Sequence, residues 1–506
     1  MFWPTFIAFS CVKALFIPAY RSTDFEVHRN WLAITSSLSL EKWYVEDTSP
    51  WTLDYPPLFA WFEYLLGFVA KHVDPAMLNV TNLDYASSRT ILFQRLSVIV
   101  TDIVYAFGVR EYTSIILRES TKSREGPYIL AILLLCNVGL FIVDHIHFQY
   151  NGFLSGILLL AMGSIMQGKH VRGAFWFAIL LNLKHIYLYI APAFFVYLLR
   201  NYCLETRSFS FKRFATLGLV VVSVFAASFG PFVYNGQLSQ VLSRLFPFKR
   251  GLSHAYWAPN IWALYNGLDK VLTAVWKQQG WLEKNVTAAM TGGLVQEFEH
   301  VVLPSIPPFV TFVLTALAML PSAIFLWRAP KNPRMFVKAV VACAFASFFF
   351  GWHVHEKAVL LIILPMTILA VHSAKDCLTW MITSVTGHVS LFPLLFTPFE
   401  TPVKICAVLL YSVTSYSLLV FLHQTKKPFT GRLTISPLLK AYWAGLSLVA
   451  LYEAVGYKFN PGHSRMPFLP LLIMSVYCAL GLLYSWLQFL WQMALNDTSV
   501  KSRKVE

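Results

Sequence analysis

Residues 214–234 read FATLGLVVVSVFAASFGPFVY and contain no charged side chain. An apolar helix of about 20 residues crosses the hydrocarbon core of a bilayer and satisfies its own backbone hydrogen bonds there. The rest of the chain is similar, because 57% of its 506 residues are hydrophobic and 13% are charged. Soluble globular domains carry about 25% charged residues. The sequence therefore predicts an integral membrane protein rather than a set of soluble domains.

Apolar segments of this kind recur along the whole chain. They predict an all-α polytopic membrane protein, a single multi-pass domain over residues 1–506 with about fourteen transmembrane helices. The segment 173–200 is short and turns at Lys184-His185, which predicts a helical hairpin or a broken helix. The predicted spans are 2–20, 90–112, 128–143, 150–167, 173–186, 188–200, 214–234, 301–327, 336–351, 358–372, 378–396, 403–422, 438–456 and 468–493.

The net charge of +15 comes from basic residues in short breaks between apolar runs. If the N-terminus is cytosolic and the spans alternate, all these clusters face one side, which the positive-inside rule makes the cytosol. The long segments 21–89 and 235–300 are then lumenal loops, with an amphipathic interfacial helix expected at 28–48. No basic stripe alternates with aromatic residues on a polar surface, so nucleic-acid binding is not expected.

The first predicted lumenal loop opens with STDFEVHRNW at 22–31. Asp24 and Glu26 follow a membrane span, so a carboxylate here can act as general base toward a sugar hydroxyl near a lipid head group. The alternative is a solvated loop start in which the aspartate caps a helix. In WTLDYPPL at 51–58, Asp54 orients a substrate or caps the helix after Pro57, and the structural role is favoured.

Three further segments carry polar residues on the predicted lumenal side. DHIHFQYNG at 144–152 offers sugar-binding groups at Gln149 and Asn151, and its spacing does not favour a metal site. FPFKRG at 246–251 and HAYWAPNIW at 254–262 place Arg250, Tyr256 and Trp257 where saccharide recognition or an interfacial aromatic belt is expected.

Candidate phosphate ligands follow later in the chain. GWHVHEK at 351–357 offers His355 and Lys357 as donors to a phosphate, and Arg465 in PGHSR at 461–465 is a further candidate. The alternative for these residues is a plain interfacial anchor. The seven cysteines form no CxxC pair, so neither a zinc site nor a disulfide framework is indicated. Sequons occur at 79–81 and 285–287 in the lumenal loops and at 496–498 in the cytosolic tail.

These segments together resemble the dolichyl-phosphate-glucose-dependent α-1,3-glucosyltransferases that extend the lipid-linked precursor of N-glycosylation. The resemblance is carried by five motifs in one order over nearly the whole chain: STDFEVHRNW, DYPPL, HFQYNG, FPFKRG and HEK. It implies a membrane-embedded fold of the GT-C type in the endoplasmic reticulum, with the active site on the lumenal side. HAYWAPN at 254–260 and DHIH at 144–147 resemble the branch that adds the second glucose.

The resemblance also implies a mechanism. The donor is dolichyl phosphate glucose and the acceptor is a dolichol-pyrophosphate-linked oligosaccharide that already carries one glucose. Transfer inverts the anomeric centre, so one carboxylate acts as base. Carried over by position, Asp24 is that base and His355 and Lys357 face the donor phosphate, with no metal or other cofactor. The alternatives are the branch that adds the first glucose and a secondary transporter, which predicts inverted repeats that this sequence does not show.

Overall fold

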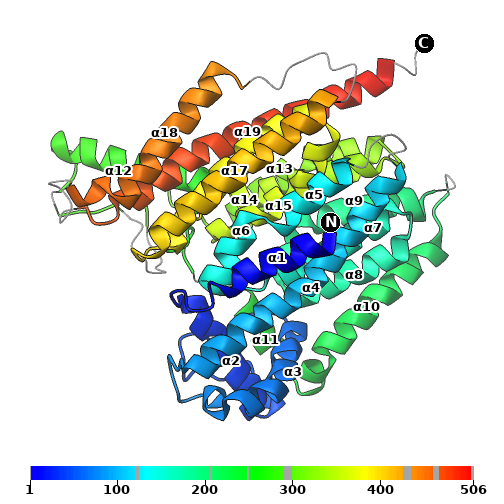
Figure 1. The fold of residues 1–506 in the computed structure, drawn as a ribbon, viewed down its shortest axis with the longest axis horizontal. Coiled ribbons are helices and arrows are strands. Elements are labelled where there is room, and N and C mark those ends of the chain that lie inside the picture. Colours follow the sequence, from blue (N-terminus) through cyan, green and yellow to red (C-terminus); the bar gives the residue numbers. More distant parts are fainter. Residues whose placement is uncertain are drawn as a thin grey trace. The chain divides into compact units, whose positions relative to one another are not determined.

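The structure is a computed structural model that describes residues 2–119, 125–205, 208–247, 250–283, 285–288, 299–425, 435–459 and 466–502. Helices make up all the regular elements of this described part (Figure 1), and its only β feature is an isolated bridge between Ser253 and Val354. The chain divides into two compact units, residues 1–247 and 248–506, and each is described separately. The boundary falls in the segment 235–300, which the sequence predicts to be the second long loop.

Eight helices in the described ranges are long and apolar enough to cross a membrane. The predicted total of fourteen is therefore not reached by this measure, because several predicted spans are shorter helices. The first, α1 (Phe2–Ala14), is 13 residues long, and α15 (Leu360–His372) has the same length. The eight candidate spans are Ser88–Arg118, Glu125–Phe148, Phe211–Tyr234, Pro308–Arg328, Pro333–Phe350, Ala374–Leu394, Glu400–Gln424 and Leu469–Leu495.

In the first unit, α4 (Ser88–Glu119) packs against α7 (Asn151–Met166), which packs in turn against α8 (His170–Leu183). Where α4 and α7 cross, a Cβ on Gly108 would collide with the backbone of Gly156, and a Cβ on Gly156 would collide with the backbone of Tyr105. Small residues at such crossings let membrane helices pack closely. Further helices of this unit are α5 (Glu125–Leu135), α6 (Val138–Leu140), α9 (Ala191–Leu198), α10 (Phe211–Tyr234) and α11 (Leu238–Leu245).

The break predicted at Lys184-His185 is confirmed. Helix α8 ends at Leu183, and the short helix η4 (His185–Ile190) begins directly after Lys184, whose extended backbone separates the two. Upstream, the π-helical segment η3 (Phe141–Phe148) leads into α7. Both interruptions lie beside polar residues, and non-helical backbone at membrane depth is tolerated where it is buried in protein or lines a cavity.

The segment 21–89 contains α2 (Thr23–Ser37), the short helices η1 (Leu40–Lys42) and η2 (Pro75–Leu78), and α3 (Pro57–Val73), which starts at a proline. Proline suits the first turn of a helix because the missing N–H would be unpaired there. The bounds predicted for a helix at 28–48 are wrong, because α2 starts at Thr23 and ends at Ser37. Arg29, Trp31 and Ile34 on this helix are buried within the first unit, and its place in the membrane interface stays a prediction.

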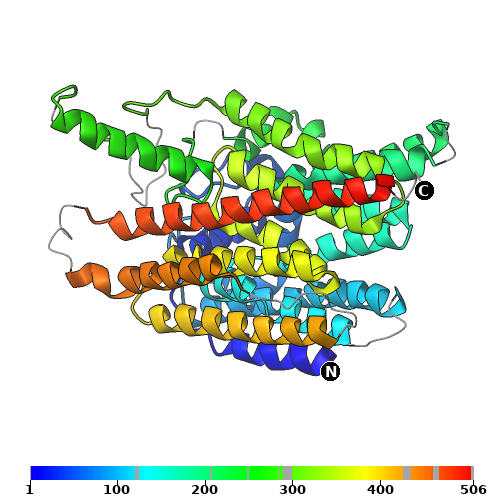
Figure 2. The same ribbon diagram turned by 90° about the horizontal axis from the view of Figure 1, so that it is seen from above.

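The second unit contains α12 (Ile261–Gln278), α13 (Pro308–Arg328), α14 (Pro333–Phe350), α16 (Ala374–Val389), α17 (Glu400–Thr425), α18 (Pro437–Ala454) and α19 (Leu469–Ser502), besides α15. Helix α19 runs beside α16 and α18 (Figure 2). An ion pair of 3.0 Å joins Lys338 on α14 to Asp376 on α16, and both side chains are buried. Charges in such places are retained only when paired.

The short helices η5 (Leu199–Cys203), η6 (Glu356–Val359), η7 (Phe392–Leu394) and η8 (Gly456–Phe459) complete the described elements. Of these, η6 follows the loop at 351–355, where His353 donates its backbone N–H to the carbonyl of Leu252 at 3.0 Å. This contact ties the break between α14 and α15 to the loop at 250–260. Two stretches about 100 residues apart in sequence therefore lie together.

Candidate active site

In the first unit, the carboxylate of Asp24 lies in the first turn of α2. Its Oδ2 accepts hydrogen bonds from Gln149 Nε2 at 2.7 Å and from His147 Nε2 at 3.0 Å. The Asp24 side chain is 20% exposed, so the carboxylate is partly accessible. The N-cap of α2 is Ser22, and the first-turn position of Asp24 means that it does not cap the helix, contrary to the alternative reading of the sequence.

A lysine links the next members of this site. Lys184 Nζ donates to Asn151 Oδ1 at 3.0 Å and to Gln149 Oε1 at 3.3 Å, and it lies 5.1 Å from the centre of the Tyr55 ring. One ammonium group therefore orients both predicted sugar-binding amides. Gln149 and Asn151, which the sequence placed in one motif, do lie in one polar cluster with Asp24.

Asp144 fixes the other end of the cluster. Its Oδ1 accepts from Asn151 Nδ2 at 2.9 Å, and its Oδ2 accepts from the backbone N–H of Gly152 at 2.5 Å. A side chain at Gly152 would collide with the carboxylate of Asp102, so the glycine permits this approach. The aspartate of the DHIH segment thus orders the start of α7.

The other two acidic residues predicted in this region have different surroundings. Arg29 donates to both carboxylate oxygens of Glu26, at 2.7 and 2.6 Å, and to the carbonyls of Met77 and Asn79. This pair orders the 77–79 backbone, and substrate binding by Glu26 stays a prediction. Asp54 is half-buried and does not cap α3, whose N-cap is Pro56. Burial raises the pKa of the neighbouring Tyr55 well above its usual range, and the charges of Asp54 and Asp24 raise it further.

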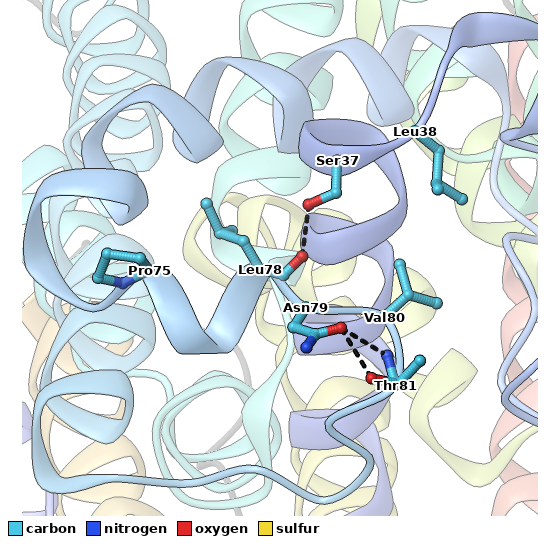
Figure 3. Close-up of a pocket in the computed structure, with 7 residues that line it drawn as sticks. All are labelled: Ser37, Leu38, Pro75, Leu78, Asn79, Val80 and Thr81. Carbon is cyan, nitrogen blue, oxygen red and sulfur yellow. Dashed lines mark hydrogen bonds between the residues drawn. The ribbon is translucent and has the colours of Figure 1, made fainter.

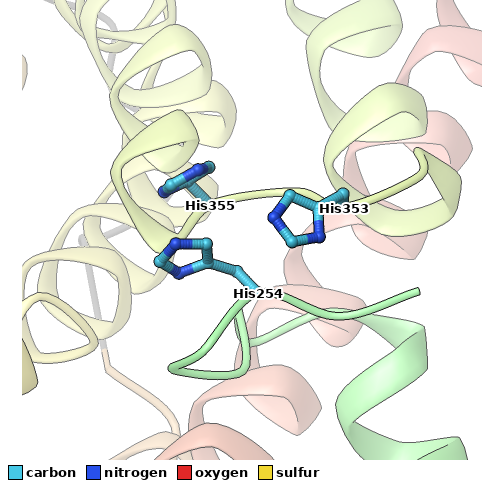
Figure 4. Close-up of side chains that lie close together, drawn as sticks. All are labelled: His254, His353 and His355. Carbon is cyan, nitrogen blue, oxygen red and sulfur yellow. The ribbon is translucent and has the colours of Figure 1, made fainter. Parts of the chain in front are cut away.

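In the second unit, three histidines gather at the junction of two loops (Figure 4). The rings of His254 and His355 lie 3.6 Å apart between centroids, and one nitrogen from each of His254, His353 and His355 falls within 4.8 Å of the others. We call these residues the three-histidine cluster. Within the described ranges it is the only group with spacing that suits a metal ion. Sequence reasoning missed it because His254 is about 100 residues from the others.

The ring of His353 is oriented by its surroundings. Its Nδ1 donates to the carbonyl of Gly251 at 2.8 Å, so its Nε2 carries the lone pair. Burial lowers the pKa of His353, and Arg250 lowers it further, while the hydrogen bond to Gly251 acts in the opposite direction. The second unit thus brings the predicted residues Arg250 and His355 to one neighbourhood, and Lys357 is half-buried in the following helix η6.

Two predicted sugar-binding aromatics lie in the same loop. Burial raises the pKa of Tyr256, and the charge of Glu356 raises it further. Trp257 is 3% exposed, and its carbonyl accepts a hydrogen bond of 2.8 Å from Ser475. This burial supports a packing role for Trp257, and its contact with sugar stays a prediction. Arg465 lies outside the described residues.

An open pocket of about 420 Å³ lies between the end of α2 and the loop at 75–81 (Figure 3). Its lining includes Asn79, whose Oδ1 accepts hydrogen bonds from the N–H and the hydroxyl of Thr81 at 3.0 and 2.9 Å. None of the residues that line this pocket is titratable, so it does not offer the acid or base that glycosyl transfer needs.

A family model described as the ALG6, ALG8 glycosyltransferase family matches residues 9–489. The chain belongs to this family. It is 51% identical over 507 residues to a Bos taurus protein named dolichyl pyrophosphate Glc1Man9GlcNAc2 alpha-1,3-glucosyltransferase, an alignment that covers 97% of this chain and 95% of that protein. An Arabidopsis thaliana protein of the same name is 44% identical over 498 residues, which cover 96% of each chain.

A Drosophila melanogaster protein named probable dolichyl pyrophosphate Glc1Man9GlcNAc2 alpha-1,3-glucosyltransferase is 52% identical over 489 residues, which cover 96% of this chain and 93% of that protein. The family membership and the apolar helices together make this protein a membrane-bound glycosyltransferase. Sequence reasoning had proposed the family from its motifs. The motifs did not identify Lys184 and His147 as site residues. The charged side chain of Lys184 between two apolar runs was a signal that could have identified it.

Proposed function

We propose that this protein transfers glucose from dolichyl phosphate glucose to a dolichol-pyrophosphate-linked oligosaccharide that already carries one glucose, in α-1,3 linkage and with inversion. The reaction takes place on the lumenal side of the endoplasmic reticulum membrane. The names of relatives that align over almost the full chain support the acceptor and the linkage. The family model supports a glycosyltransferase rather than a transporter.

The observation that carries the chemistry is the Asp24 carboxylate held by His147 and Gln149. A single inverting displacement needs one base. Asp24 takes the proton from the acceptor hydroxyl while that oxygen forms its bond to the anomeric carbon of glucose. The bond from this carbon to the phosphate oxygen breaks, and its electron pair leaves with dolichyl phosphate.

The leaving phosphate needs no general acid, because it is stable as an anion. His355 and Lys357 donate hydrogen bonds to it and offset the charge that develops during bond breaking. Arg250 lies in the loop that contacts the same segment and contributes positive charge there. The proposal assigns no step to a metal ion or another cofactor, although the three-histidine cluster has ligands that suit one.

The proposal is tested with purified protein, labelled dolichyl phosphate glucose and two acceptors, one with a single glucose and one with none. Transfer to the first acceptor alone, with a product sensitive to an α-1,3-specific glucosidase, is expected. Transfer to the acceptor without glucose would instead assign the protein to the first step. The absence of transfer to both acceptors, with protein that remains folded, would overturn the proposal.

A further inference from the structure

The backbone between the two ligands of Asp24 is strained. Phe148 has a φ of 96°, in the left-handed region that a bulky side chain rarely adopts. Its buried ring packs 5.2 Å from Phe25 and 5.7 Å from Tyr150, which holds the conformation in place. Strain of this kind gathers at functional sites. Here it turns His147 and Gln149, on either side of Phe148, toward one carboxylate oxygen.

His147 connects Asp24 to a tyrosine. Its Nε2 lies 3.0 Å from Asp24 Oδ2, and its Nδ1 lies 3.0 Å from the hydroxyl of Tyr20. A carboxylate only accepts hydrogen bonds, so Nε2 must carry a proton. In the neutral ring Nδ1 is then an acceptor, and the Tyr20 hydroxyl donates to it. Tyr20 therefore selects the tautomer that donates to Asp24.

The main-chain carbonyls of Tyr20, His145 and His147 accept hydrogen bonds from two neighbouring side chains. The buried guanidinium of Arg95 on α4 donates to the carbonyl of His145 at 2.8 Å and to the carbonyl of Tyr20 at 2.9 Å. Ser22 donates its hydroxyl to the carbonyl of His147. These hydrogen bonds fix the main chain at Tyr20 and His147, so their side chains need little ordering when a substrate binds.

From this geometry we propose that His147 is a positioning residue for Asp24, and that Tyr20 holds His147 in the donating tautomer. The inference rests on the proposed function, because it takes Asp24 as the base. Two N–H donors on Oδ2 keep the carboxylate ionised and fix its orientation toward the acceptor hydroxyl. His147 acts through Asp24 and contacts no substrate in this proposal.

Other charged and titratable groups lie around these hydrogen bonds, and all stay unchanged in the variants below, including the buried Lys13, Asp102 and His145 on α1, α4 and η3. The others are Arg95 on α4, Asp144 on η3, Lys184 before η4, Asp54 and Tyr55 before α3, and the His28–Glu63 pair between α2 and α3.

The test compares Tyr20→Phe, His147→Ala and His147→Gln in purified protein. Tyr20→Phe lets the ring adopt the other tautomer, so kcat is expected to fall about tenfold with little change in KM, as the loss of one hydrogen bond to a charged group predicts. Because Asp24 then loses a donor that favours its ionised form, the acidic limb of the pH profile moves to higher pH. His147→Ala is expected to give a larger effect in the same direction.

His147→Gln supplies an amide N–H near the position of Nε2 and has no tautomer to select. It is expected to restore most of the rate that His147→Ala loses, and Tyr20→Phe should then add no further loss. This non-additivity is a readout that a merely structural role would not produce. The matched control is Tyr85→Phe, which removes a tyrosine hydroxyl that contacts Asp74 instead, at 3.2 Å, and should leave the pH profile unchanged.

Two outcomes overturn the inference. One is a normal kcat and pH profile in both Tyr20→Phe and His147→Ala, and the other is full additivity of Tyr20→Phe with His147→Gln. Asp24→Asn separates this failure from that of the proposed function. If Asp24→Asn is inactive while the Tyr20 and His147 variants behave as wild type, the positioning role alone is wrong. If Asp24→Asn retains transfer, the assignment of the base is wrong and the inference falls with it.

Discussion

Replacing Lys184 with methionine tests whether the amide network is needed for catalysis. The substitution keeps the length of the side chain and removes its charge and its donors. Gln149 Oε1 then loses the hydrogen bond of 3.3 Å from Lys184 Nζ, and it keeps only the marginal contact of 3.5 Å with the Tyr55 hydroxyl. The amide can rotate and turn its oxygen toward Asp24, which replaces a hydrogen bond of 2.7 Å with repulsion.

The magnitude follows from these contacts. A hydrogen bond to a charged group contributes about 1.5–3 kcal/mol, and the bond from Gln149 to Asp24 is the one that the rotation removes. The loss of this contribution from the transition state corresponds to a fall of roughly ten- to a hundredfold in kcat. Asn151 loses its donor too, so we expect a modest loss of thermal stability alongside the loss of rate.

The assay measures initial rates of glucose transfer with purified Lys184→Met, with the folded fraction determined by size-exclusion chromatography and thermal unfolding. Lys184→Arg keeps the charge but changes the donor geometry, so an intermediate rate is expected. Lys71→Met, which replaces an exposed lysine near the end of α3, is the control and should transfer at the wild-type rate. A kcat for folded Lys184→Met within about twofold of wild type would refute the reasoning.

Four further predictions follow from the site and its surroundings. Asp24→Asn is expected to lower kcat about a hundredfold or more in a transfer assay, and a near-normal rate would remove Asp24 as the base. Burial raises the pKa of Glu63, and its hydrogen bond to His28 lowers this pKa in part. The stability that Glu63 contributes is therefore present at low pH and is lost as the pH rises above the usual range of a glutamic acid. Thermal unfolding of Glu63→Gln should depend less on pH in that window. Asn79 is exposed and lies in a sequon, so Asn79→Gln should reduce the mobility shift on glycosidase treatment if the 21–89 segment is lumenal, whereas the shift would be unchanged by this substitution if the segment is cytosolic. Chelation with EDTA is expected to leave the transfer rate unchanged, whereas a loss that Zn²⁺ restores would assign a metal to the three-histidine cluster.

The membrane class followed directly from the sequence. Long apolar runs such as 214–234 have one stable solution in a bilayer, which is a helix that satisfies its own backbone. The break at Lys184 was also visible, because a charged residue followed by histidine interrupts two apolar runs. The number of spans was not fixed in this way, because segments of 13 to 16 residues such as α15 and α7 are apolar but shorter than a bilayer requires.

The candidate site was predicted in part. Asp24, Gln149 and Asn151 were named from motifs, and they do share one polar cluster, but no motif indicates that Lys184 joins the two amides. The amphipathic pattern predicted at 28–48 did not show that its polar residues have internal partners: Arg29 pairs with Glu26, and His28 pairs with Glu63 at 2.8 Å. Pattern alone does not distinguish a polar face toward water from a polar face toward a buried partner.

The sequence by itself determined that this is a helical membrane protein and which residue types are available for glycosyl transfer, because these properties depend on composition and on short contiguous motifs. Only the tertiary structure decided which of those residues meet. The contact between Tyr20 and His147 spans 127 positions, and the ligands of Asp24 lie more than 120 positions away along the chain. Such contacts depend on how helices pack and on the strained turn at Phe148, and neither leaves a local signal in the order of residues.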